Sequence, residues 1–160
     1  MANVHTKPSI VTSAAAPGLP LVFGGCIYVL WRSTSLLMFR WFDAAGLLPA
    51  IQEARLTASS VRSHLPLWFL YSLPDAAWAS CGVLIFAAIW SGSRHPARHF
   101  WVLLAPSLAL GGEFAQLLRL LPGTFDIADV IACTLLSAVS VALSNRLFGY
   151  GIRPHQAQFL

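Results

Sequence analysis

The chain has 160 residues, of which 57% are hydrophobic and only 10% are charged, and its mean hydropathy is +0.68. This charge content is too low to cover the surface of a soluble domain of this size, so the composition favours a protein whose exterior faces lipid. The net charge is +4, but the ten lysines and arginines are scattered singly between apolar runs, which argues against a nucleic-acid partner.

Four apolar segments predict an all-α integral membrane bundle of about four short transmembrane helices in a single domain. Ser72 and Asp75 have the spacing of a capping box and predict where the second span begins. Pro122 and Gly123 are expected to stop the third span, and Thr124 to cap the fourth. In chain order, the predicted spans cover residues 11–31, 73–90, 100–121 and 125–148.

Between the first two spans, residues 33–62 alternate apolar residues with charged ones such as Arg40, Asp43 and Glu53. The apolar residues of this segment form no run long enough to cross a bilayer. We therefore expect one or two amphipathic helices that lie along the membrane interface.

The three cysteines, Cys26, Cys81 and Cys133, all lie inside apolar segments, and no pair of them has the spacing of metal ligands. The chain also has no phosphate-binding loop and no helical pair of zinc-binding histidines. These observations predict neither a disulfide framework nor a bound metal or cofactor.

With four spans, both termini lie on one side of the membrane, together with the polar turn at residues 91–99. The ten cations divide five to five between the two sides, so the positive-inside rule gives no preference. All six acids fall on the side opposite the termini or in the helix ends nearest to it. We therefore expect cytoplasmic termini and an outward-facing polar site.

In the third span, Glu113, Gln116 and Arg119 recur every third residue and so share one face of a helix. The tight turn that follows makes the third and fourth spans antiparallel neighbours, which is expected to bring Arg119 close to Asp126 and Asp129. The fourth span continues from these two aspartates into a small, polar face that should point inward. That face consists of Cys133, Ser137, Ser140 and Ser144.

Two interpretations of these polar residues remain open. They can join helices and cap helix ends, or they can form a ligand or reaction site, which we favour because ionisable residues inside a membrane are costly and usually functional. Paired carboxylates can act as acid and base or hold a hard cation, so the sequence leaves open whether the protein is an enzyme. The candidate ligand-binding residues are Asp75, Glu113, Gln116, Arg119, Asp126 and Asp129.

Three stretches of this sequence resemble the hallmark of VanZ-like membrane proteins: Glu113 to Gln116, Pro122 to Asp129 and Leu73 to Trp78. Together they cover the chain from about residue 65 to residue 147. The chain departs from the pattern after Asp129, where Cys133 and Leu136 stand in place of an asparagine and a glycine-containing helix, so the resemblance does not imply an activity that needs that amide. The resemblance marks as signature positions Asp75, Glu113, Gln116, Asp126 and Asp129, with Arg119 as a looser match.

The resemblance implies a bacterial inner-membrane protein connected with resistance to a glycopeptide antibiotic. The leading hypothesis is an envelope protein whose polar cleft binds or modifies an amphiphile such as a lipid-linked cell-wall intermediate or a glycopeptide antibiotic. The alternative is a non-catalytic accessory subunit that packs against a larger membrane complex through its small-residue faces. Transport of a small solute is less favoured, because four short spans leave little room for a path.

Overall fold

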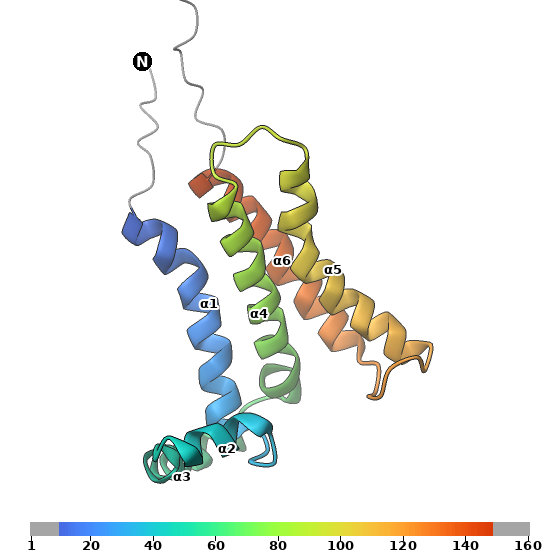
Figure 1. Ribbon diagram of the computed structural model, residues 1–160. Helices are drawn as coiled ribbons and strands as arrows, with labels where there is room; N and C mark the ends of the chain where they lie inside the picture. Colours follow the sequence, from blue (N-terminus) through green and yellow to red (C-terminus); the bar gives the residue numbers. More distant parts are fainter. Residues whose placement is uncertain (1–9, 149–160) are drawn as a thin grey trace, which may run out of the picture.

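The computed structural model describes residues 10–148 and folds them into six α-helices (Figure 1), which confirms the all-α prediction. Three of the helices in this part of the chain are long and apolar enough to cross a membrane, namely α4, α5 and α6. The apolar part of α1, Ala15–Trp31, is shorter. The helices are α1 (Ile10–Trp31), α2 (Leu37–Ala44), α3 (Leu48–Arg62), α4 (Leu67–Ile89), α5 (Ala97–Leu117) and α6 (Ile127–Phe148).

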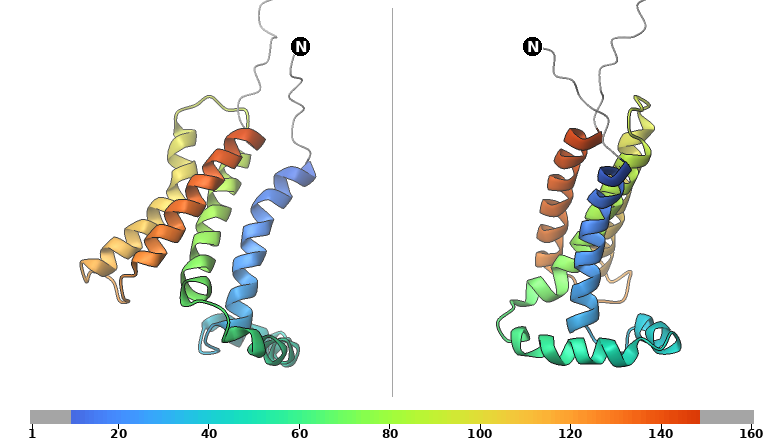
Figure 2. Two further views of the ribbon diagram at one scale, coloured as in Figure 1. Left: turned by 180° about the vertical axis from the view of Figure 1, so that it is seen from behind. Right: turned by 90° about the vertical axis from the view of Figure 1, so that its left-hand side faces the viewer.

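The four long helices run alongside one another, whereas α2 and α3 lie across one end of α1 (Figures 1 and 2). The start of α1, the connection between α4 and α5, and the end of α6 lie together at the other end of the bundle. We call the end that carries α2, α3, the start of α4 and the turn between α5 and α6 the distal end. The chain therefore reverses direction from each long helix to the next, as predicted.

Helix α4 is the centre of the bundle, since it contacts α1, α5 and α6. Its core residues Val83, Leu84 and Ala87 pack with Val102 of α5 and Phe148 of α6. In a second cluster the small residues Ala76 and Ala79 of α4 pack with Cys133 of α6, and such small residues are common where membrane helices approach closely. In contrast, only 11% of the most apolar window of α5 is buried within the chain, compared with 56% for α4. Helix α5 therefore presents most of its apolar surface outward.

The second predicted span begins earlier than expected, because α4 starts at Leu67 and not at residue 73. Ser72 and Asp75 therefore lie inside the helix, and the prediction that they form a capping box is wrong. Pro66 precedes the helix in an extended conformation, while Pro74 is accommodated in its interior. A proline inside a helix removes one backbone hydrogen bond, a loss that packed membrane helices tolerate.

The third span also has different limits from those predicted, since α5 begins at residue 97 and ends at Leu117, before Pro122 is reached. Arg119 adopts a left-handed conformation with φ of 57°. The N–H of Leu120 donates to the carbonyl of Ala115 at 2.8 Å, and the N–H of Arg119 donates to that of Gln116 at 2.9 Å. This is the hydrogen-bond pattern of a Schellman motif, and it ends the helix without help from the proline.

The fourth span begins at Ile127, and its cap is Asp126, so the prediction that Thr124 caps this helix is wrong. A carboxylate oxygen of Asp126 accepts a hydrogen bond of 2.8 Å from the N–H of Ala128. Aspartate is among the preferred N-cap residues, because its side chain pairs a backbone donor that the helix leaves free.

Residues 33–62 form the two short helices α2 and α3, within the range that the sequence predicted. The guanidinium of Arg55, on α3, donates to the carbonyls of Val29 at 2.5 Å and Arg32 at 2.9 Å, and that of Arg62 donates to Trp31 at 2.6 Å. These carbonyls at the end of α1 have no helical partner of their own, and cations are favoured at a helix C-terminus. The two arginines therefore fasten α3 to α1.

Candidate functional site

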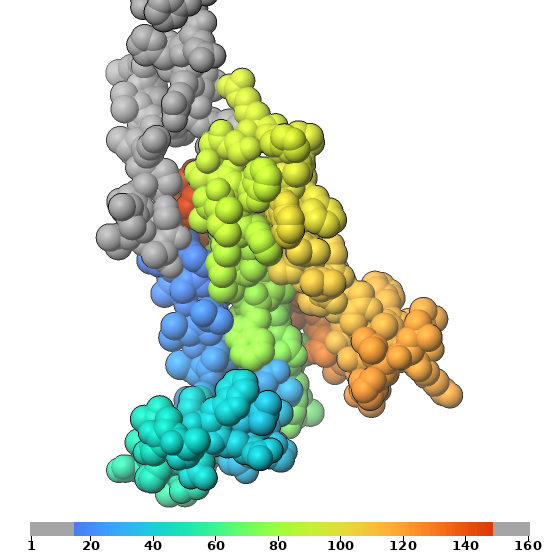
Figure 3. Space-filling view, viewed as in Figure 1, coloured from blue at the N-terminus to red at the C-terminus, as the bar shows by residue number. Residues whose placement is uncertain are grey.

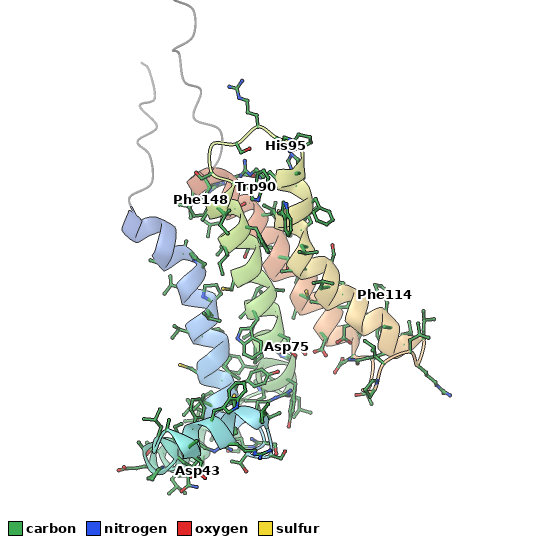
Figure 4. All side chains as sticks on the ribbon, viewed as in Figure 1. Asp43, Asp75, Trp90, His95, Phe114 and Phe148 are labelled. Carbon is green, nitrogen blue, oxygen red and sulfur yellow. The ribbon has the colours of Figure 1, made fainter. Side chains whose placement is uncertain are left out.

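Four carboxylates lie at the distal end of the bundle and come from three helices. Asp75 is on the distal part of α4 (Figure 4), Glu113 is near the end of α5, and Asp126 and Asp129 are at the start of α6. The charges of Asp75 and Asp129 are close enough to interact, as are those of Glu113 and the other three. We call this set the distal acids.

The molecular surface is indented between the α2–α3 pair and the tip formed by α5 and α6 (Figure 3). The elements that carry the distal acids border this indentation. Asp75 and Asp126 are exposed, while Glu113 and Asp129 are half-buried. A ligand that approaches the distal end therefore meets carboxylates from α4, α5 and α6.

Glu113 joins α5 to α6, because one of its carboxylate oxygens accepts a hydrogen bond of 3.4 Å from the N–H of Asp126. Gln116 lies against the turn: a Cβ added to Gly123 would be only 2.8 Å from the Gln116 side-chain carbon Cδ. Gly123 has φ of 132°, a conformation that residues with a side chain rarely adopt. Gln116 therefore packs on the turn that places Asp126 beside Glu113.

Asp129 differs from the other distal acids because its oxygen Oδ1 is buried and has no hydrogen-bond partner among the described residues. The residue lies in the first turn of α6, where the helix dipole favours a negative charge. One turn further along, Cys133 packs with Ala76 and Ala79 of α4. Buried polar atoms in folded proteins are nearly always hydrogen-bonded, and a bound ligand or water would supply the donor for this carboxylate oxygen.

Sequence reasoning missed Tyr28 and Arg32, which reach this site from α1. The hydroxyl of Tyr28 donates a 2.8 Å hydrogen bond to Asp75, and its ring stacks on Trp78 with centroids 4.6 Å apart. The guanidinium of Arg32 lies 4.8 Å from the ring centroids of both Tyr28 and Tyr71, a distance at which cation–π attraction operates. The polar residues at the end of the first apolar segment were the available signal for this part of the site.

A glycine allows α1 to approach α4 at this point. A Cβ added to Gly24 would lie 2.9 Å from the Trp78 ring and 3.0 Å from the carbonyl oxygen of Pro74. Only glycine leaves room for this approach, which brings the next turn of α1 and its Tyr28 to Asp75.

The prediction that Arg119 lies among the acids is not supported by its position. Arg119 is exposed in the turn after α5, and within residues 10–148 no hydrogen bond or ion pair joins it to any acid. The left-handed residue that ends α5 is Arg119 itself, which the regular helical spacing could not anticipate. The cation that accompanies the distal acids is therefore Arg32.

In the described part of the chain, no three histidine, cysteine, aspartate or glutamate side chains are grouped closely enough to hold a metal ion. The distal acids come from three different helices, α4, α5 and α6. Such an arrangement suits hydrogen bonds and charge interactions with several polar groups of a larger ligand.

Replacing Tyr28 by phenylalanine tests the link between α1 and Asp75. We expect this variant to keep the stacking on Trp78 but to lose about 1 kcal/mol of stability with the hydrogen bond. Tyr71→Phe is the matched control, because its ring contacts Arg32 while its hydroxyl has no hydrogen bond among the described residues. Thermal unfolding in detergent measures both, and equal midpoints for the two variants would contradict the assigned bond.

No protein-family model, curated protein or solved structure matches the chain.

Proposed function

We propose that the chain is a VanZ-like, multi-pass protein of the bacterial inner membrane, with α1 as a fourth span. Helix α1 has 22 residues. At the helical rise of ~1.5 Å per residue this length corresponds to about 33 Å, compared with a hydrocarbon core of about 30 Å. Its contact with α4 supports the assignment, as does the stretch of apolar residues from Ala15 to Trp31. The three stretches that resemble VanZ-like proteins support this proposed family.

In this proposal the termini are cytoplasmic and the distal end faces outward. Helices α2 and α3, which lie across the end of the bundle, occupy the membrane interface, and the exposed Trp41 of α2 lies at the level of the lipid headgroups. Exposed apolar residues on both short helices, including Leu37 and Leu56, support this placement.

The distal acids bind the polar part of an amphiphilic envelope molecule, either a lipid-linked intermediate or a glycopeptide-type antibiotic. The observation that carries this proposal is the gathering of four carboxylates from three apolar helices. One of these carboxylates, that of Asp129, has a buried oxygen without a described partner. Charged groups at membrane helices are costly, so their concentration at one end favours a function. Among the described residues the four acids interact with one cation, Arg32, and this excess of negative charge favours a ligand that carries an ammonium group.

Binding is the activity that this arrangement supports. Whether the bound molecule is also modified depends on its chemistry, since carboxylates placed close together are suited to act as acid and base.

Glu113→Gln tests the proposal, with Glu53→Gln as the control. The control removes the same charge from an exposed position on α3, outside the distal acids. Wild type and both variants are purified in mild detergent, and mass spectrometry identifies the molecules that stay bound. We expect an amphiphile in the wild type and the control. In Glu113→Gln the amount of bound amphiphile should fall about tenfold or more, since a hydrogen bond to a charged group contributes about 1.5–3 kcal/mol.

Retention of the same amphiphile by Glu113→Gln would contradict a role for the distal acids in binding. If all three proteins instead retain one protein partner and no amphiphile, the alternative is supported and the acids are structural.

The alternative function is that of a non-catalytic accessory subunit in a larger membrane complex. It is favoured by the outward apolar surface of α5 and by a groove of about 520 Å³ between α5 and α6. Ser140 and Ser144 of the serine face of α6 are only 6% and 0% exposed, so they point inward as predicted and are not available to a partner. Ser137 is 7% exposed and is one of the residues that line the groove. A partner would therefore bind along α5.

A further inference from the structure

A cavity of about 370 Å³ opens where α3 crosses the end of α1, and none of the distal acids lines it. It combines two arginines, a hydroxyl and an amide with apolar side chains. Such a mixture is typical of a site that fixes one polar group against an apolar body. The residues that line it include Trp31, Gln52, Arg55, Leu56, Ser59 and Arg62.

The two arginines are held in place before any ligand arrives. Both donate to carbonyls at the end of α1, and the guanidinium of Arg55 also lies 5.2 Å from the ring centroid of Phe39. An arginine has about five N–H donors, so the two bonds of Arg55 and the one of Arg62 leave most of them free. Further donors therefore remain to bind a second acceptor.

No carboxylate among the described residues forms an ion pair with Arg55 or Arg62. The cavity thus contains two positive charges whose partners in this part of the chain are neutral carbonyls. Two cations in one cavity repel each other, and an anion between them would remove that repulsion. Guanidinium groups match the geometry of a phosphate group particularly well.

We propose that this cavity binds the phosphate of a membrane phospholipid, held by Arg55 and Arg62. The hydroxyl of Ser59 and the amide of Gln52 are placed to contact the polar headgroup, and Leu56 and Trp31 lie beside the acyl chains. The cavity is at the end of α1, where the proposed membrane topology places the lipid headgroups. The inference shares that topology with the proposed function but does not depend on the ligand of the distal acids.

The probe is dioctanoyl phosphatidylglycerol, titrated into the full chain in neutral detergent and counted by native mass spectrometry. Arg62→Gln removes one charge and keeps a side chain that can donate to the end of α1. Ser59→Trp fills the cavity while both arginines remain. Arg40→Gln is the matched control, because Arg40 is exposed on α2 and does not line the cavity. Dioctanoylglycerol supplies the same tails without phosphate, and inorganic phosphate supplies the anion without tails.

We expect one saturable site for phosphatidylglycerol, weakened about tenfold in Arg62→Gln, lost in Ser59→Trp and unchanged in Arg40→Gln. Equal weakening in Arg40→Gln would overturn the proposal, because binding would then reflect overall charge. Equal binding of dioctanoylglycerol would also overturn it, because the phosphate would not be recognised. Inorganic phosphate that binds as tightly as the lipid would overturn the assignment to a phospholipid. The Glu113→Gln variant should bind the probe normally, which separates this site from the distal acids.

Discussion

Replacing Gly82 by leucine is expected to separate α4 from α5 and to destabilise the bundle. A Cβ added to Gly82 would collide with the Cβ of Ala105, so even a methyl group does not fit without movement of a helix. Overpacking of a close contact costs about 1–3 kcal/mol, and a leucine adds three further carbons to the collision. The unfolding midpoint in detergent, followed by circular dichroism, measures the effect.

Gly111→Leu is the matched control for this prediction, since a Cβ added to Gly111 meets nothing within 4 Å. The contact between Gly82 and Ala105 also allows a compensating substitution. The double variant Gly82→Ala with Ala105→Gly moves the methyl group from one helix to the other, and it should be more stable than Gly82→Ala alone. Equal midpoints for Gly82→Leu and Gly111→Leu would show that α4 and α5 do not approach each other at this point.

Arg55→Ala is expected to release α3 from α1 while the long helices stay packed. The variant leaves the carbonyls of Val29 and Arg32 without their donors and removes the contact with Phe39. Each hydrogen bond from a charged group contributes about 1.5–3 kcal/mol, and the cation–π contact adds about 0.5–1 kcal/mol. Hydrogen exchange should therefore become faster throughout α3, with little change in α4.

Arg40→Ala provides the comparison for Arg55→Ala, because it removes a charge from the same pair of short helices at an exposed position. It should leave the exchange of α3 unchanged. If α3 is equally protected in both variants, its position across the end of α1 does not depend on the arginine contacts described above.

The long helices could be predicted because a run of apolar residues identifies a span whatever it packs against. Their limits were harder to predict from local patterns. Ser72 and Asp75 lie inside α4, which continues through Pro74, and α5 ends before Pro122 is reached. A proline weakens a helix, but packing against neighbouring helices decides whether the helix continues.

The grouping of the acids could also be predicted. Because consecutive spans run in opposite directions, Asp75, Glu113 and Asp129 lie at the same end of the bundle. The contacts of individual side chains could not. The bond from Tyr28 to Asp75 joins residues 47 positions apart, and it depends on the close approach of α1 at Gly24. The prediction for Arg119 is wrong for a local reason. Its left-handed conformation ends α5, so Arg119 does not share a helix face with Glu113 and Gln116.

The central claim is that an amphiphile from the membrane binds at the distal end, and site-specific photo-cross-linking tests it most directly. A photoreactive residue replaces Phe125, next to the distal acids, or Phe100, which is exposed near the start of α5 at the opposite end. After illumination of intact membranes, the mass of each adduct identifies what was bound. The account predicts one amphiphile attached at position 125 and little at position 100. Equal labelling at both positions, or a protein attached at position 125, would contradict it.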